Sequence, residues 1–256
     1  MTITFLGTGT SQGVPVIACT CPVCKSKNIK DKRLRSSVLI ETCNKSIVID
    51  TGPDFRYQML RAHVSQLDAI LFTHEHKDHV AGLDDVRAFN FKQRTAIPIY
   101  AKKRVLEALN REFHYVFSDQ RYPGIPQLHI HEIGEEKFDV AGEISVLPID
   151  VMHFKLPVNG FRIGGFTYIT DAKTISDTEI QKIKGTEILV LNALQKEKHI
   201  SHLTLEEAIE LAHKVNPKRT YLTHISHKLG RHEDVSATLP LDIGLAYDGL
   251  KLVLDD

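Results

Sequence analysis

The segment from His74 to His79 constrains this chain more than any other, because four candidate metal ligands, His74, His76, Asp78 and His79, lie within six residues. It reads His-Glu-His-Lys-Asp-His and follows the apolar residues 69–72, which predict a buried strand. At a strand-to-helix turn, His74 and His76 can point one way while Asp78 and His79 point another, and imidazole and carboxylate are ligands that Zn²⁺, Mn²⁺ and Fe²⁺ accept. The alternative is a solvated polar loop, but a loop does not require this pattern. We therefore expect two adjacent divalent ions at the end of a buried strand.

Three further ligand candidates occur later in the chain, each near the end of a predicted strand: His153, Asp171 and His224. Strand ends are the usual place for a site built on a sheet. Taken singly, each residue would be an ordinary polar side chain. Taken with the first motif, they complete seven ligands for two cations, with one carboxylate bridging. Such a pair can stabilise both the attacking and the leaving oxygen of a displacement.

A second cluster consists of Cys19, Cys21 and Cys24. Three thiols this close indicate a tetrahedral zinc site that lacks one ligand rather than a disulfide framework. His227 can supply the fourth ligand, and the zinc would then be structural, tying the N-terminal loop to the rim of the active site. The alternative is that the thiols are reduced and hold no metal. Cys43 stands apart, and we expect a small buried or edge residue there.

Apolar runs and turn residues predict an α/β chain in which strands followed by a helix occur twice. With 42% apolar residues, the chain can bury its core as one large domain or as two fused halves. In the first half we expect strands at residues 3–6, 37–41, 46–50 and 69–73, with helices after residue 54, near 82–91 and at 102–112. In the second half we expect strands at residues 143–147, 160–164, 166–170, 188–191 and 219–223, with a helix at 205–215. Thr204 and Glu207 have the spacing of a capping box at the start of that last helix.

The charge balance argues against a polyanionic partner. Lys and Arg together number 32, as do Asp and Glu, so no overall field draws the protein to nucleic acid or to an acidic membrane surface. Apolar runs such as residues 69–72 fall far short of the roughly 20 residues that cross a bilayer, and the first residues show no secretory signal. We expect a cytoplasmic protein with no membrane partner.

The His-x-His-x-Asp-His motif, followed in order by His153, Asp171 and His224, resembles the metallo-β-lactamase-fold hydrolases. The resemblance implies an αββα sandwich with a dinuclear site at one edge. It covers residues 1–256 as a single domain, with a Cys-rich zinc loop near residues 19–24. Further motifs resemble the branch that contains the phosphoribosyl 1,2-cyclic phosphate phosphodiesterase of the carbon–phosphorus lyase pathway: residues 5–15, the cysteine cluster, Thr223-His224-Ile-Ser-His227 and Tyr247-Asp-Gly249.

The resemblance also assigns roles to single residues. One metal ion would be held by His74, His76 and His153, the other by Asp78, His79 and His224, with Asp171 bridging them. Asp50 corresponds to an acidic motif of the family and would support the ligands without touching metal. Asn192 stands at a strand end where relatives commonly carry an acidic residue.

Ser201-His202-Leu203-Thr204 resembles an element of the branch in which the histidine contacts the scissile phosphate and protonates the leaving oxygen. The resemblance therefore assigns this role to His202. A substrate contact by His199 stays open. So does one by Arg33 or Arg35, which lie in a basic run whose simpler interpretation is a solvated face.

These observations predict a dinuclear, metal-dependent phosphodiesterase that acts on a small phosphodiester, such as a sugar cyclic phosphate. A hydroxide bridging two Zn²⁺, Mn²⁺ or Fe²⁺ ions would attack phosphorus, with Asp78 and His202 as the catalytic residues. The main alternative is the transfer-RNA 3′-end endonuclease of the same superfamily. However, Asp171 follows His153 by only 18 positions, which leaves no room for that enzyme's substrate arm.

Other classes stay open. By fold alone, the protein could be a thioester or β-lactam hydrolase. It could also be a non-catalytic metal or redox sensor that uses the cysteine cluster. A homodimer is compatible with the sequence, and nucleic acid is not an expected partner.

Overall fold

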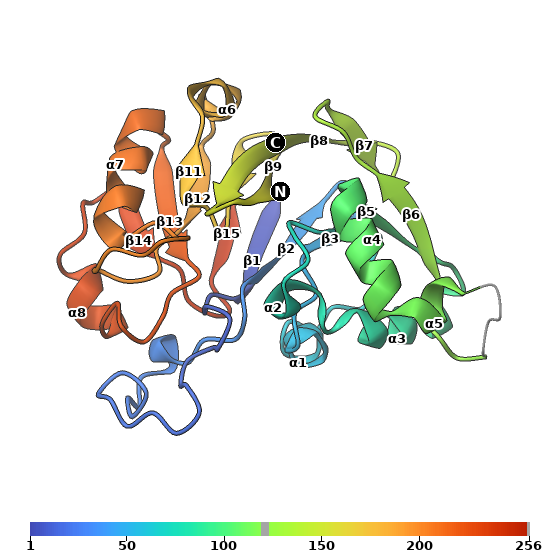
Figure 1. Ribbon diagram of the computed structural model, residues 1–256, viewed down its shortest axis with the longest axis horizontal. Helices are drawn as coiled ribbons and strands as arrows, with labels where there is room; N and C mark the ends of the chain where they lie inside the picture. The colour runs from blue at the N-terminus through green and yellow to red at the C-terminus, as the bar shows by residue number, and fades with distance from the viewer. Residues whose placement is uncertain (119–122, 255–256) are drawn as a thin grey trace.

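Two β-sheets lie face to face in the computed structural model, which describes residues 1–118 and 123–254, and helices lie on both sides of the pair (Figure 1). The layers follow the order helix, sheet, sheet, helix. The expected α/β sandwich is therefore confirmed, and so is its origin in two sheet-and-helix halves.

The first sheet contains the first and the last strand of the described chain. Its order is β15 (Lys251–Val253), β1 (Thr2–Gly7), β2 (Ser37–Thr42), β3 (Lys45–Ile49), β4 (Ala69–Leu71), β5 (Ile97–Ala101) and β6 (Leu128–Glu132). Neighbours from β15 to β3 are antiparallel, and neighbours from β3 to β6 are parallel. Because parallel strands end at the same edge of a sheet, the loops after β3, β4 and β5 emerge together.

The second sheet has the order β11 (Thr174–Ile175), β8 (Ile144–His153), β9 (Leu156–Ile163), β10 (Phe166–Tyr168), β12 (Ile188–Asn192), β13 (Arg219–Thr223) and β14 (Ile243–Leu245), and β7 (Phe138–Val140) pairs with β8. Strands β10, β12, β13 and β14 are parallel to one another. The loops that follow them therefore also meet at one edge.

Helices of the first half are α1 (Phe55–Arg61), α2 (Lys77–Val80), α3 (Arg87–Gln93), α4 (Lys103–Glu112) and α5 (His114–Phe117). Those of the second half are α6 (Asp177–Ile183), α7 (Leu205–Val215) and α8 (His232–Ser236), and 3₁₀ turns occupy Ile29–Asp31 and Leu83–Val86. The predicted capping box is present at α7, where the Thr204 hydroxyl and the Glu207 carboxylate each accept the other residue's backbone N–H. No helix in the described part of the chain is long and apolar enough to span a bilayer.

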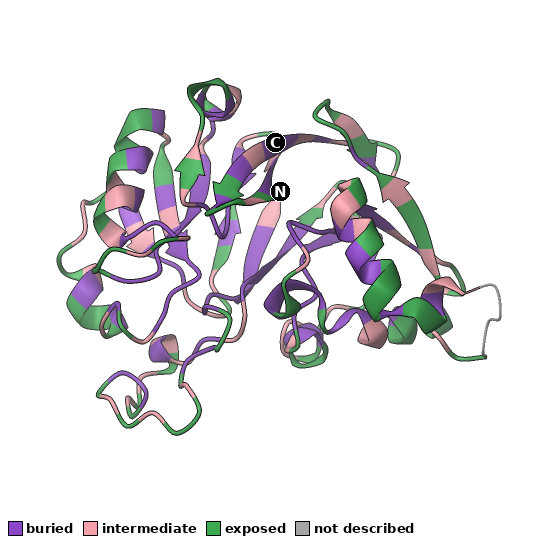
Figure 2. Cartoon of the chain, viewed as in Figure 1, coloured by how far each residue is buried: buried purple, intermediate pink, exposed green. Residues whose placement is uncertain are grey.

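Three apolar layers stabilise the sandwich, one between the sheets and one under each set of helices. Consecutive residues of a strand serve different layers. Phe5 packs between the sheets while Leu6 packs toward the first set of helices, and Val190 and Leu189 divide in the same way in β12. All four side chains are fully buried, as the purple central strands of Figure 2 show. Burial on both faces explains why these strands read as continuous apolar runs.

Most predicted elements coincide with observed ones, but the boundary expected at residue 147 is wrong, since β8 continues to His153. Pro148 lies between the part of β8 that pairs with β7 and the part that pairs with β11. A proline is tolerated there because no strand pairs with it on that side. Strands β5, β6, β7, β11, β14 and β15 were not predicted.

Candidate metal centre

The seven predicted ligands reach one edge of the sandwich from both sheets. His74 follows β4, His76 is the N-cap of α2, Asp78 and His79 lie in α2, His153 is the last residue of β8, Asp171 follows β10, and His224 follows β13. His153 was expected beyond the end of its strand. It lies instead at the last position of β8, because the strand continues through Pro148. All seven except His76 are buried or nearly so.

Left-handed backbone turns aim several of these side chains. Asp50, Asp171 and His224 have φ angles of 66°, 58° and 54°, a region that residues other than glycine adopt infrequently. Each turn comes directly after a strand or within three residues of its end. Such strain concentrates where the surrounding structure must fix a functional side chain.

Two glycines allow α2 to lie against the loop that follows β3. A Cβ atom on Gly52 would come within 2.2 Å of the Asp78 carbonyl oxygen, and a Cβ on Gly82 within 2.2 Å of the Gly52 carbonyl oxygen. The contact is secured by backbone hydrogen bonds of 2.8 Å from Thr51 N to His79 O and from Gly82 N to Thr51 O. No larger residue at position 52 or 82 would let Asp78 and His79 reach their observed places without a backbone shift.

Asp171 lies at the middle of the cluster. Its Oδ2 is 3.7 Å from His74 Nε2, and its Oδ1 is 3.4 Å from His79 Nε2 and 3.2 Å from His224 Nδ1. Three groups of donor atoms lie within 4.8 Å of one another: Asp78, His79, Asp171 and His224; His74, His76 and Asp171; and His153, Asp171 and His202. Only Asp171 belongs to all three of these groups, the position that a bridging carboxylate requires.

Asp50 orients two of the histidines from behind. Its carboxylate accepts hydrogen bonds from His79 Nδ1 at 2.7 Å, from Thr73 Oγ1 at 2.8 Å and from Thr73 N at 2.9 Å. Because the Thr73 hydroxyl donates to Asp50, it must accept from His74 Nδ1, which lies 2.9 Å away. Both Nε2 atoms therefore face the cluster, and among the described residues both are buried without a hydrogen-bond partner.

The pKa shifts in the ligand cluster indicate that this site favours a positive charge. Burial alone would lower the pKa of His79, yet Asp171, Asp78 and Asp50 together hold it well above its ordinary value. Burial would likewise raise the pKa of Asp171, but His224 and His79 hold it well below the ordinary range. Ionised carboxylates and free imidazole nitrogens, buried together, match the ligand chemistry of a divalent cation.

His202 lies inside the cluster, just before α7. Its ring centroid is 4.5 Å from that of His153 and 4.9 Å from that of His224. Burial lowers its pKa to about 3, and its buried Nδ1 has no partner among the described residues. His153 Nδ1 donates to Ser201 O at 2.7 Å, which connects β8 to the segment that carries His202. His199 lies further out, with its ring 5.2 Å from His202.

The three thiols and His227 also come together. Cys19, Cys21 and Cys24 Sγ lie 3.3, 3.4 and 3.6 Å from His227 Nδ1, and the four donor atoms are within 4.8 Å of one another. In a tetrahedral zinc site with ordinary bond lengths, sulfur and nitrogen ligands stand about 3.5 Å apart. The geometry therefore fits the predicted fourth ligand. Cys43 is exposed in the β2–β3 turn, so the expectation of a small buried or edge residue is wrong.

Arg33 and Arg35, the two arginines considered as phosphate contacts, differ in burial and in their partners. Arg33 is 4% exposed and donates to Thr8 Oγ1, to Ala246 O and to His232 Nδ1, so it is part of the core and not of a solvated face. Arg35 is partly exposed and pairs with Asp54 at 3.2 Å. The hydrogen bonds and ion pairs of these two side chains go to residues other than the predicted metal ligands.

Asn192, at the end of β12, explains part of how Asp171 is placed. Its Oδ1 accepts from Ala172 N at 2.7 Å, and its Nδ2 donates to Ala172 O at 3.0 Å. An ionised aspartate could make only the first of these bonds. The sequence offered no signal for this role, and none for Thr73 or for Ser36, whose hydroxyl lies 3.2 Å from His224 Nδ1.

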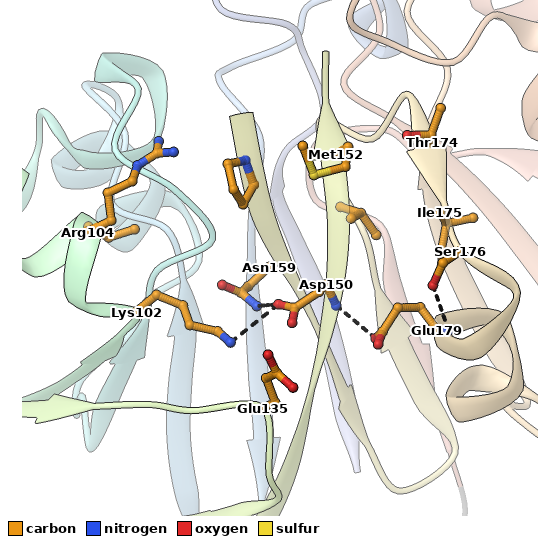
Figure 3. A pocket seen from close by; sticks show the side chains of 13 residues that line it. Lys102, Arg104, Glu135, Asp150, Met152, Asn159, Thr174, Ile175, Ser176 and Glu179 are labelled. Carbon is orange, nitrogen blue, oxygen red and sulfur yellow. Dashed lines mark hydrogen bonds and ion pairs between the residues drawn. The ribbon is translucent and has the colours of Figure 1, made fainter. Parts of the chain in front are cut away.

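A cavity of about 630 Å³ adjoins the centre on the side of β5 and β8. Figure 3 shows Lys102 and Arg104 on one wall, Asp150 and Asn159 in the middle, and Ile175 on the opposite wall. None of the predicted metal ligands lines it. It is therefore a neighbouring space and not the metal site itself.

Comparison with known proteins places this geometry in a family. Residues 45–225 match the model described as the β-lactamase superfamily domain. The crystal structure of a diphosphatase from the PhnP family is 40% identical, with a TM-score of 0.93, and the match covers 99% of this chain and 98% of that one. Zn²⁺-bound PqqB from Methylobacterium extorquens shares the fold, with 19% identity, a TM-score of 0.77 and coverage of 99% and 100%.

Among curated proteins, an octanoyltransferase of Porphyromonas gingivalis is 40% identical over 254 residues. The match covers 98% of this chain but 51% of that protein. The chain therefore spans about half the length of this relative.

Proposed function

The chain belongs to the β-lactamase superfamily, and from that premise we propose that it is a dinuclear metal-dependent phosphodiesterase. The observation that carries the proposal is the donor set around Asp171. The Nε2 atoms of His74 and His79 are buried without hydrogen-bond partners among the described residues, and a carboxylate oxygen of Asp171 lies within 3.7 Å of each. The diphosphatase of the PhnP family, similar over nearly its whole length, supports phosphorus as the reacting centre.

We assign His74, His76 and His153 to one ion, Asp78, His79 and His224 to the other, and Asp171 to both. When bound, two divalent ions would make an attacking water available near neutral pH and neutralise the phosphate. The protein's part is to fix the ligands: Asp50 and Thr73 orient His74 and His79, Ser201 O orients His153, and Asn192 holds the chain beside Asp171. We likewise propose that Cys19, Cys21, Cys24 and His227 hold a structural zinc.

His202 is assigned to the scissile phosphate and the leaving oxygen. Because burial lowers its pKa to about 3, the ring is neutral in the free protein. A phosphate anion against the ring would favour its protonated form, the form that can donate a proton to an alkoxide. Asp78 is the second residue that we place at the reaction, since it completes the donor group opposite His74 and His76.

The proposed substrate is small. Between His153 and Asp171 the chain forms only the β8–β9 hairpin and β10, with no arm that could hold a transfer RNA as the rival endonuclease would. The octanoyltransferase name belongs to a protein about twice as long. A metal or redox sensor would need the thiols but not the second, complete donor cluster.

Hydrolysis of bis(p-nitrophenyl) phosphate tests the proposal, with metal-free protein, protein reconstituted with Mn²⁺ or Zn²⁺, and an Asp78→Ala control. We expect metal-dependent release of nitrophenolate that the variant loses. Absence of release from protein with both sites occupied would refute phosphodiester chemistry and favour thioester hydrolysis or the sensor.

A further inference from the structure

We infer that the cavity beside the metal centre is the subsite for a nucleoside, so that the substrate class is a phosphodiester carrying a nucleobase. The inference rests on the proposed function. It names the part of the substrate that the metal ligands do not touch.

The cavity lining is connected to the centre at three points, the first being the hydrogen bond of 3.1 Å from Asn159 N to the carbonyl oxygen of Thr73, which precedes His74. Arg104, on the cavity wall, binds the carboxylate of Glu75, the residue between His74 and His76. Met152, also on the wall, precedes His153, and its carbonyl oxygen accepts from Lys173 N at 2.7 Å. A phosphate held at the metal ligands would therefore have its organic substituent beside this opening.

The charges of the cavity argue against a second phosphate. Its lining has two cationic side chains, Lys102 and Arg104, and three carboxylates, those of Glu135, Asp150 and Glu179. Both cations already have acidic partners: Lys102 Nζ is 3.4 Å from Asp150, and Arg104 binds Glu75. Glu179 is paired with Lys182 at 2.8 Å, so Glu135 is the lining carboxylate without an ion pair among the described residues. A lining without an unpaired cation does not attract a phosphate, so the anionic end of a substrate is directed to the metal centre and a neutral group to the cavity.

The remaining surface suits a planar heterocycle. The apolar walls come from Val105, Val151, Met152, Pro157 and Ile175. Asn159 lies between them, 4% exposed, and donates through Nδ2 to Asp150 at 2.6 Å. Its Oδ1 has no hydrogen-bond partner in the described part of the chain, and in Figure 3 it points away from Asp150 toward the side of Lys102 and Arg104.

An amide acceptor aimed into an apolar space selects a ring that carries an N–H or amino donor. The volume of about 630 Å³ is in the usual range for a bound small molecule, roughly 300–1,000 Å³. A bare sugar cyclic phosphate would leave most of it unused. A nucleoside supplies both the ring and the donor.

Two esters with the same reacting group test the inference: the p-nitrophenyl ester of thymidine 5′-phosphate and methyl p-nitrophenyl phosphate. We expect kcat/KM of the metal-loaded protein to be at least about 10-fold higher for the thymidine ester, the effect of one group fitted into an apolar pocket. Ile175→Trp fills the cavity and should bring the ratio close to one. Leu241→Trp, at a side chain that is 97% exposed and outside the cavity, is the matched control and should keep the wild-type ratio.

Equal kcat/KM values for the two esters in the wild type, or an unchanged ratio in Ile175→Trp, would overturn the subsite while leaving the phosphodiesterase intact. If neither ester is hydrolysed, the proposed function fails, and calorimetric binding of thymidine 5′-phosphate decides the subsite separately. Binding weakened at least about 10-fold by Ile175→Trp but not by Leu241→Trp supports the inference. No binding to the wild type overturns it.

Discussion

Replacing Asn192 by alanine should destabilise the protein and also impair the metal centre. Asn192 is fully buried and forms two hydrogen bonds to the Ala172 peptide. In the variant, Ala172 O keeps its bond from Leu203 N at 2.9 Å, but Ala172 N loses its partner. A buried N–H left unpaired costs about 1–3 kcal/mol, and the space vacated by the amide adds to this.

We therefore expect the free energy of unfolding to fall by about 3 kcal/mol, and the melting temperature by about 6–12 °C for a chain of this size. Because Ala172 follows Asp171, the carboxylate that we propose as the bridge between the two ions should lose its fixed position. We expect kcat/KM for bis(p-nitrophenyl) phosphate to fall at least about 10-fold, corresponding to about 1.4 kcal/mol of transition-state stabilisation.

Asn90 offers a matched control, because its buried amide forms the same kind of clamp elsewhere. It bonds Gln127 N, Gln127 O and Thr95 O at 2.8–2.9 Å. Asn90→Ala should lose comparable stability in urea unfolding but keep its kcat/KM at a temperature where both variants are folded. The reasoning would be refuted if Asn192→Ala unfolded at the wild-type urea concentration, or if both variants lost activity equally.

Three further predictions follow from the same contacts. His202→Ala should lower kcat about 10²–10⁴-fold for an alkyl leaving group but little for p-nitrophenolate, and a uniform loss across a leaving-group series would contradict its role as proton donor. Cys24→Ser should lose about one zinc per chain by mass spectrometry of metals and melt earlier, because three ligands hold zinc less well than four; unchanged zinc content would argue for unliganded thiols. Burial and Arg33 lower the pKa of His232 to about 4 from 6.5. As the pH falls from 6.5 toward 4, the unfolded chain therefore binds a proton before the folded protein does, and the free energy of unfolding should fall by about 2 kcal/mol. When urea unfolding is compared at pH 7 and pH 4.5, His232→Gln should lose less unfolding free energy on acidification than the wild type does. An equal loss in the two proteins would show that another group dominates the pH dependence.

The sequence predicted the parts of the molecule that depend on local patterns. The segment of candidate ligands from His74 to His79 and the capping box of α7 each occupy a few adjacent residues, and their spacing alone indicated the clustering of donor atoms and the helix start that the structure has. The long apolar runs predicted the central strands for the same reason. Each of these carries its information within one short segment.

What the sequence did not predict depends on contacts between distant segments. Arg33 reads as one of several surface cations, but its partners Thr8, Ala246 and His232 come from both ends of the chain. The clamp from Asn192 joins the end of β12 to the loop after β10, twenty residues earlier in the chain. The short edge strands β14 and β15 contain three residues each, too few for a periodic pattern to stand out.

Metal content tests the central claim most directly. We predict that the purified, reconstituted protein holds about three divalent ions per chain, two at the Asp171 cluster and one at the thiols. Asp171→Ala should then retain about one ion and Cys24→Ser about two, as measured by inductively coupled plasma mass spectrometry. A wild-type protein that holds only one ion, or an Asp171→Ala variant with wild-type metal content, would contradict the account.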